Sequence, residues 1–231
     1  MLKILNILCA FLLVATGARG AENSNIDIEY PPAIDICKHA PWCDFVAVEK
    51  KLHPIHSSSP LMPISNFSFN FDIPKNFEKI TLLPAGITIL AFFYGNYSIN
   101  FTTESLKAIT PNIKKNKKMD AAKANARYSP IDIFEIAFTS KSTFKEPSNL
   151  WDRVLWRAAF MQKWLRYENA SDFSIYRLDK LSVYTVDIKQ DNTSIAIVTS
   201  KKIPEKYMKI TGSGIPKEVF LNILSSLRLE N

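Results

Sequence analysis

Residues 148–167 read SNLWDRVLWRAAFMQKWLRY and hold three of the four tryptophans of the chain. At 100° per residue, this stretch predicts a long helix whose apolar side chains divide into two stripes on different faces. One stripe has the i, i+4 spacing of a core face, as expected for a helix that lies on a sheet. It consists of Leu150, Val154, Ala158, Met161 and Leu165.

The second stripe of this helix is aromatic and lies roughly opposite the first. It consists of Trp156, Phe160, Trp164 and Tyr167, with Arg153 and Arg157 at its edges. Trp, Tyr and Arg are the residue types enriched at interface hot spots, so the stripe predicts a partner-binding surface. Large aromatic side chains are also commonly buried, and the alternative is that the N-terminal segment covers the stripe.

Residues 1–21 are expected to be a cleaved signal peptide. Lys3 precedes an apolar run at residues 4–15, and small residues follow at residues 17–21. The run is shorter than the roughly 20 apolar residues that span a membrane, although an uncleaved anchor is the alternative. We therefore predict a periplasmic or secreted protein with no integral membrane span after cleavage.

The net charge of the full chain is +7, and Lys3 and Arg19 of the expected signal peptide supply two of these charges. A balance of this size is ordinary for solubility and does not indicate a nucleic-acid partner. It mildly favours an acidic partner or an anionic membrane surface. Residues 114–118 read KKNKK. They are typical of a solvated loop, and the alternative is a patch for a phosphate or a lipid headgroup.

Two cysteines, Cys37 and Cys43, lie after the expected cleavage site, and in an exported chain they predict a disulfide that closes a small loop. Loop-closure entropy makes such a bridge worth about 2 kcal/mol. The three histidines, His39, His53 and His56, all lie within twenty residues of this pair. Sulfur and imidazole ligands can bind zinc or copper, but this spacing matches no closed structural zinc motif. We therefore predict no metal and no cofactor.

The chain is expected to have an irregular, proline-rich segment at residues 22–65 and one α+β domain at residues 66–231. The stretch NFSFNFDIP alternates from Asn66, so that Phe67, Phe69 and Phe71 share one face of a strand that Pro74 ends. Further strands are predicted at residues 80–83, 87–93, 97–101, 173–178, 181–189, 194–201 and 207–211. A short strand or helix is expected near residues 45–51.

Four helices are predicted besides these strands. Thr102 or Thr103 caps a short one that Pro111 ends, and a capping box at residues 129–132 begins another, with a strand over residues 133–138 as the alternative. The others are residues 148–167 and a C-terminal helix opened by Pro216. Together they predict an α+β fold, an antiparallel sheet flanked by helices in an α/β/α-like sandwich.

Three features resemble exported domains of the PsbP-like type. They are the strand FSFNFDIP, the meander that leads into a capped helix, and the ending YMKITGSGIPKEVFLNILSSLRL, and the resemblance covers residues 66–229. It implies an antiparallel sheet sandwiched by helices and a non-enzymatic accessory or binding role. It carries no catalytic residue that could be transferred to this chain.

The sequence contains no G-x-S-x-G nucleophile elbow, and its two candidate cysteine nucleophiles are expected to be oxidised. We therefore predict a non-enzymatic exported binding protein whose partner is another protein, in the favoured version an immunity-type inhibitor of a toxin. An envelope component is the other protein partner considered. The alternatives are a small-ligand or lipid carrier, with the aromatic helix over a pocket, and a hydrolase of a type without recognisable motifs.

Overall fold

The computed structural model describes residues 30–53, 60–85, 87–111 and 117–230. The expected signal peptide at residues 1–21 lies outside these ranges. Within them, no helix combines the length and the apolar character that a membrane crossing requires.

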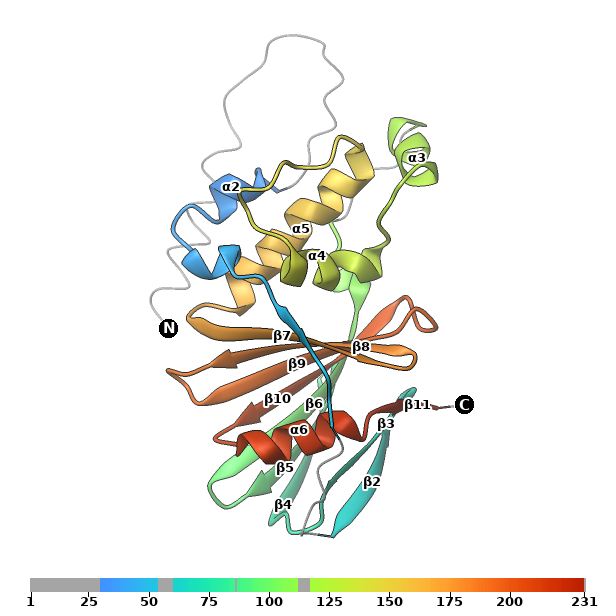
Figure 1. Ribbon diagram of the computed structural model, residues 1–231. Coiled ribbons are helices and arrows are strands. Elements are labelled where there is room, and N and C mark those ends of the chain that lie inside the picture. Colours follow the sequence, from blue (N-terminus) through green and yellow to red (C-terminus); the bar gives the residue numbers. More distant parts are fainter. Residues whose placement is uncertain (1–29, 54–59, 86, 112–116, 231) are drawn as a thin grey trace.

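A large sheet of eight strands runs through the middle of the molecule (Figure 1). Its strands, in order across the sheet, are β1 (Val48–Lys50), β7 (Ala170–Leu178), β8 (Leu181–Ile188), β9 (Thr193–Thr199), β10 (Lys206–Ser213), β6 (Tyr97–Ser105), β5 (Ile87–Tyr94) and β4 (Lys79–Ala85). Neighbouring strands are antiparallel except β1 and β7, which are parallel. The predicted antiparallel sheet is therefore present, with one parallel strand added at its edge.

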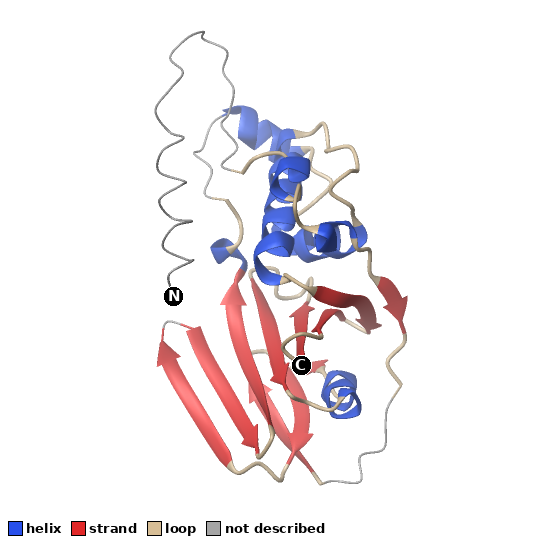
Figure 2. Ribbon diagram, turned by 90° about the vertical axis from the view of Figure 1, so that its left-hand side faces the viewer, coloured by secondary structure: helices blue, strands red, loops and turns tan. Residues whose placement is uncertain are grey.

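Different elements cover the two faces of this sheet. On one side lie α2 (Ala33–Ile36), the 3₁₀ turn η1 (Pro41–Asp44), α4 (Ile133–Thr139) and α5 (Leu150–Arg166), with α3 (Lys117–Ala124) beyond them. On the other lie α6 (Lys217–Ser225) and a three-stranded sheet of β11 (Arg228–Leu229), β3 (Phe69–Pro74) and β2 (Leu61–Asn66). In the side view of Figure 2, most helices gather in one layer and α6 packs alone beside the strands.

Strand alternation divides the interior into two cores. On β8, Tyr184 and Val186 face the helical layer, whereas Val183 and Leu181 face α6 and the small sheet. Successive side chains of a strand point to opposite faces, so a central strand that is buried on both sides contributes to both cores. The α+β fold class predicted from the sequence is confirmed.

The N-terminal segment is more regular than expected. Strand β2 begins at Leu61, inside the part predicted to be irregular, and pairs with β3 in an antiparallel hairpin. Phe67 lies in the turn of this hairpin with a positive φ of 54° and an exposed side chain. The predicted strand with Phe67, Phe69 and Phe71 on one face is thus wrong at its start, because the chain reverses between Asn66 and Phe69.

Local capping signals explain several helix starts. The Asn149 side chain accepts hydrogen bonds from the backbone of Trp151 and Asp152 at the start of α5, and a capping box at Ser129 opens the 3₁₀ turn η3 (Pro130–Asp132) that leads into α4. The strand alternative for α4 is wrong. The expected cap at Thr102 or Thr103 is also wrong, since β6 continues to Ser105 and Ser105 caps the 3₁₀ turn η2 (Leu106–Ala108).

Helix α5 is buried on nearly all sides. Between Trp151 and Lys163 every residue is buried except Arg153 and Arg157, which are partly buried. The helix packs on α4 and also contacts α2, η1 and α3, while α4 is the helix that lies against β7 and β8. Leu165, predicted to be on the core face, is 59% exposed. A helix that is surrounded in this way needs no polar face toward solvent. Its two apolar stripes therefore both pack against neighbouring elements.

The orientation of α5 predicts a large loss of stability for one substitution and almost none for another. Phe160→Ala removes a fully buried ring and should lower the free energy of unfolding by about 3–5 kcal/mol. Leu165→Ala, at the exposed position, should change it by less than about 0.5 kcal/mol. Urea denaturation of the two variants measures both values, and a larger loss for Leu165→Ala would contradict this orientation.

Candidate functional site

The six residues predicted to bind a partner do not form a free surface. Trp156 is 5% exposed, Phe160 and Tyr167 are almost completely buried, and Trp164 is partly buried. At the C-terminal end of α5 the stripe faces inward: the Tyr167 ring packs edge-on against Phe138 of α4 and Phe173 of β7. The stripe as a whole is therefore not exposed, and its C-terminal end is covered by α4 and β7 rather than by the N-terminal segment.

The two arginines beside the stripe hold other segments in place. The Arg157 guanidinium donates to both carboxylate oxygens of Glu146, at 2.9–3.2 Å, and to the Tyr30 carbonyl oxygen at 3.2 Å. Glu146 also accepts from the backbone N–H of Ala33, the first residue of α2. Arg153 donates to the carbonyl oxygens of residues 147 and 148, just before α5. Both arginines therefore stabilise the fold rather than present charge to a partner.

The predicted disulfide is present in the segment that packs against α5. Cys37 and Cys43 are bonded, with their Cα atoms 5.8 Å apart, and both side chains belong to the core under the helical layer. Within the described ranges, no group of three or more His, Cys, Asp or Glu side chains gathers in a way that could hold a metal ion. His56, one of the three histidines considered, lies outside those ranges.

Lys163 is a fully buried lysine that the sequence alone did not indicate. Its ammonium group donates to the carbonyl oxygens of Phe45, at 2.6 Å, and of Ser140, at 3.2 Å. It also lies over the rings of Phe160 and Phe173. Lys163 follows Phe160 by three positions and Trp156 by seven, which places it on the aromatic stripe, and this spacing is the signal that could have found it.

Desolvation lowers the pKa of Lys163 to about 7, against an opposing attraction from Asp44. A neutral amine has two N–H groups, and the two carbonyl oxygens accept one each. The neutral form is therefore satisfied in this position without a counter-charge. The residue joins the end of η1 to the end of α4, so its role is structural and responds to pH.

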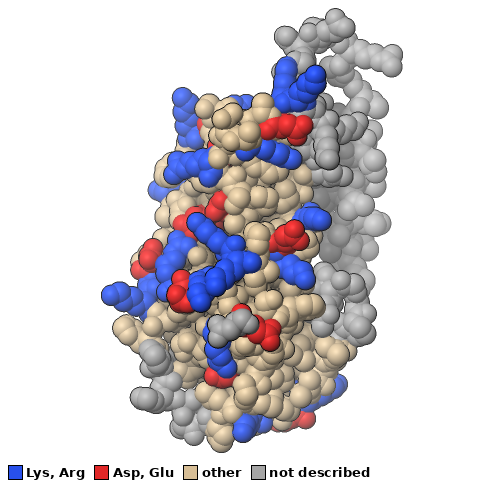
Figure 3. Space-filling view, turned by 90° about the vertical axis from the view of Figure 1, so that its right-hand side faces the viewer, with Lys and Arg blue, Asp and Glu red and all other residues tan. Residues whose placement is uncertain are grey.

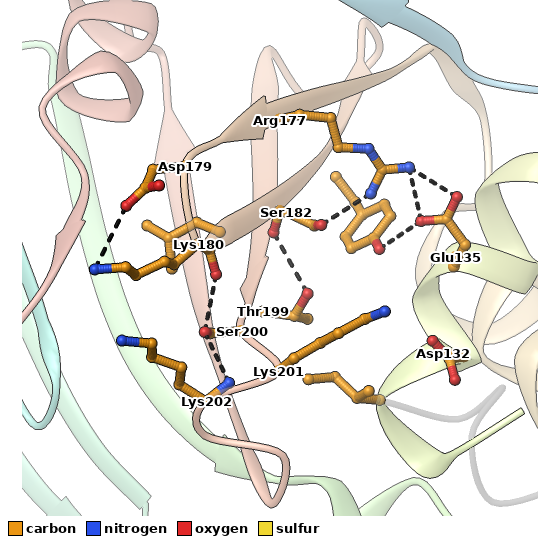
Figure 4. A pocket seen from close by; sticks show the side chains of 13 residues that line it. Asp132, Glu135, Arg177, Asp179, Lys180, Ser182, Thr199, Ser200, Lys201 and Lys202 are labelled. Atoms are coloured by element: carbon orange, nitrogen blue, oxygen red, sulfur yellow. Dashed lines mark hydrogen bonds and ion pairs between the residues drawn. The ribbon is translucent and has the colours of Figure 1, made fainter.

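An open cavity of about 520 Å³ lies where the β7–β8 turn and the β9–β10 connection meet η3 and α4 (Figure 4). It is lined mainly by polar and charged side chains: Asp132, Glu135, Arg177, Asp179, Lys180, Ser182, Tyr184, Thr199, Ser200, Lys201 and Lys202, with Ile131 and Leu181 as its apolar part. We call this cavity the basic pocket. Strands β7, β8 and β9, the loop after β9, η3 and α4 all contribute to it, so residues far apart in the sequence meet there.

Glu135 sits at one wall of the basic pocket with its hydrogen bonds already made. It accepts from the Arg177 guanidinium at 2.8 and 2.9 Å and from the Tyr184 hydroxyl at 2.8 Å. The hydrogen bond to Glu135 raises the pKa of Arg177, and burial, aided by Glu135, raises the pKa of Tyr184. This network is a fixed wall, because its donors and acceptor satisfy one another.

The remaining acids of the pocket are also engaged. Asp132 accepts from the backbone N–H and the hydroxyl of Ser129, and Asp179 pairs with Lys180 at 3.7 Å. Lys201 and Lys202, in contrast, form no ion pair within the described part of the chain. Figure 4 shows the Lys201 side chain extended toward Asp132 and Glu135, and Lys202 pointing the other way. Two exposed cations are therefore available to an incoming anion.

Further basic side chains, with acidic ones beside them, lie on the same side of the molecule. Figure 3 shows basic side chains gathered near the middle of the face seen from the right of Figure 1, the side on which the β7–β8 and β9–β10 turns project. Another hollow, at the β8–β9 turn, contains Lys217, which is paired closely with Asp187, and one exposed lysine without an ion pair in the described ranges, Lys189, against two in the basic pocket. The basic pocket is thus the better candidate for binding an anionic group.

The described part of the basic patch considered from the sequence does not line the pocket. In KKNKK, only Lys117 and Lys118 lie within the described ranges, at the start of α3 and away from the residues that line the pocket. The sequence predicts Lys201 only as the end of a strand, and Glu135 and Arg177 are 42 positions apart. The pair Lys201 and Lys202, directly after a predicted strand, is the feature of the sequence that could have indicated this pocket.

Comparison with known proteins finds no match: no protein-family model matches the chain, and no curated protein matches it. The resemblance to PsbP-like domains therefore stays a prediction, and function has to be inferred from the residues themselves.

The buried amine predicts a pH-dependent stability. The pKa of Lys163 is about 7 in the folded state and close to 10.5 when the chain is unfolded, so between these values the unfolded state binds more protons. The free energy of unfolding should therefore rise with pH across this window, by up to about 1.4 kcal/mol per pH unit from this residue. Below about pH 7 both states are protonated and this dependence disappears.

Lys163→Met is the matched variant, because it keeps the length of the side chain and removes the titrating group. Urea denaturation of both proteins from pH 6 to pH 10 measures the difference in stability at each pH. This difference should grow in favour of the wild type above pH 7. A difference that is constant across the whole range would show that Lys163 does not titrate in this window.

Proposed function

We propose that this protein is an exported, non-enzymatic binding protein that recognises another protein through the basic pocket. The observation that carries the proposal is the pair Lys201 and Lys202, two exposed cations in a cavity whose three acids already have partners. An unpaired cation at a rim attracts an anionic group from a partner and speeds encounter. The partner is therefore expected to present an Asp or Glu side chain.

The shape and lining of the cavity favour a protein over a small ligand. Small-molecule sites are concave, mostly apolar and bury most of the ligand surface. The basic pocket is open to solvent, and its lysines and Asp179 are exposed, so it would leave much of a small ligand uncovered. A cavity of this kind suits a side chain that a larger partner inserts from outside. A small-ligand or lipid carrier is the second candidate, and an anionic ligand is the form that this pocket favours.

The chemistry of the lining favours binding over catalysis. None of the residues that line the basic pocket is a cysteine or a histidine, and Glu135 accepts three hydrogen bonds from Arg177 and Tyr184. A carboxylate held in this way is a poor general base, since three of its roughly four lone-pair sites already accept hydrogen bonds. An inhibitor of the immunity type, which blocks a toxin by covering it, needs recognition of this kind and no reacting group.

Charge reversal at the pocket should remove partner binding. Lys201→Glu/Lys202→Glu replaces the two unpaired cations with anions, so capture of the partner from the host's envelope fraction should fall at least tenfold. The matched control is Lys107→Glu/Lys141→Glu, which changes the net charge equally at two exposed lysines outside the pocket. Quantitative mass spectrometry of the captured proteins compares the three baits. Equal capture by all three would overturn the proposal, and so would an anionic small molecule bound to the wild type alone.

Glu135→Gln should act in the opposite direction. It removes a negative charge from the wall of the pocket and leaves Arg177 with Glu49, at 4.0 Å, as its remaining ion-pair partner, so an acidic partner should bind several-fold more tightly. Titration calorimetry with the captured partner measures the change. Weaker binding by Glu135→Gln would indicate that the carboxylate itself contacts the partner.

A further inference from the structure

A second hollow lies directly beside the basic pocket. Its volume is about 420 Å³, and it shares Asp179, Lys180 and Leu181 with the basic pocket. The remaining lining residues are Leu178, Leu227, Arg228 and Leu229. The two hollows are therefore the two sides of one ridge, the β7–β8 turn.

The ridge is short and well defined. Leu178 and Leu181 form the last pair of the β7–β8 ladder, so that Asp179 and Lys180 alone make the turn, and Asp179 has a positive φ of 34°. Two-residue turns with positive φ match the twist of the flanking strands and hold the hairpin tightly. A ridge of this kind keeps the two hollows at a constant separation.

The second hollow has fewer charged side chains than the basic pocket, and four of its seven lining residues are leucines. Leu181 and Leu227 are buried and form part of its lining at depth, while Leu178 and Leu229 are partly buried and remain accessible. Its one cation outside the ridge, Arg228, already pairs with Asp72 at 3.2 Å and donates to the Ser226 carbonyl oxygen at 2.9 Å. The cation is therefore not available in the way that Lys201 and Lys202 are. We call this hollow the leucine pocket.

We propose that the two pockets bind one segment of the partner protein together, with an acidic side chain in the basic pocket and a large apolar side chain in the leucine pocket. This inference rests on the proposed function and specifies the partner segment. Charge complementarity determines which side of the ridge takes which group: the unpaired lysines attract the carboxylate, and the four leucines favour an apolar side chain. The constant ridge between them requires a set spacing of the two groups along the partner.

Selection from a random peptide library displayed on phage tests this inference on the full-length protein. Wild-type protein should enrich peptides that carry Asp or Glu at a constant spacing from Leu, Ile, Met or Phe. With Lys201→Glu/Lys202→Glu as the target, the acidic preference should disappear. With Leu229→Ser, the apolar preference should disappear and the acidic preference should remain.

A synthetic peptide with the enriched sequence then gives affinities by fluorescence polarisation. Each of the two target variants should weaken binding about tenfold, whereas Lys107→Glu/Lys141→Glu should match the wild type. Thermal unfolding checks that Leu229→Ser is folded. Leu229→Phe provides a second reading, because a larger side chain narrows the leucine pocket and should shift the enriched apolar residue toward smaller ones.

The outcomes separate this inference from the proposed function. Acidic enrichment without an apolar position at constant spacing would overturn the two-pocket inference and leave acidic recognition in place. The two-pocket inference would also fail if Leu229→Ser and Leu229→Phe both select the wild-type apolar pattern. Absence of acidic enrichment, or of any enriched peptide, would overturn both proposals.

Discussion

Helix α5 is apolar on two faces, and burial on nearly all sides is the constraint around which the helical layer is built. A helix that gives no face to solvent must be surrounded, and here α2, η1, α3 and α4 all contact it. The Arg157–Glu146 pair and the Cys37–Cys43 bridge hold α2 and η1, the N-terminal elements among these, in place. Lys163 is the most deeply buried polar residue of α5: its amine donates hydrogen bonds to two backbone carbonyl oxygens, and desolvation lowers its pKa.

Because α5 is buried, the candidate binding surface lies elsewhere, at the β7–β8 turn of the large sheet. The aromatic residues that resemble an interface hot spot are used inside the molecule, where ring packing joins α5 to α4 and β7. The exposed chemistry lies instead on turns that the sheet holds rigidly, as is common for binding sites. The β7–β8 turn separates a charged hollow from an apolar one, and both are defined by residues of the same hairpin.

Two unpaired lysines side by side in one cavity make the basic pocket a better candidate than isolated exposed lysines elsewhere. Its acids each have a specific partner close by: Glu135 has Arg177 and Tyr184, and Asp132 has Ser129. Lys201 and Lys202 follow strand β9 closely, and no acidic side chain in the described ranges pairs with them. Exposed ion pairs contribute little to stability, so unpaired lysines cost the fold almost nothing and remain free to meet a partner.

The sequence by itself determined the fold class, most of the strands, the capping box before α4, the helix at α5 and the disulfide. These features depend on local periodicity, on capping residues and on the separation of two cysteines, which neighbouring residues encode. It did not determine that the chain turns at Phe67 or that Leu165 faces solvent, because a two-stripe helix does not reveal which stripe a distant segment will cover. Nor did it reveal the basic pocket. Glu135, Arg177 and Lys201 lie on three separate elements, and only the pairing of β7, β8 and β9 beside α4 brings their charges together.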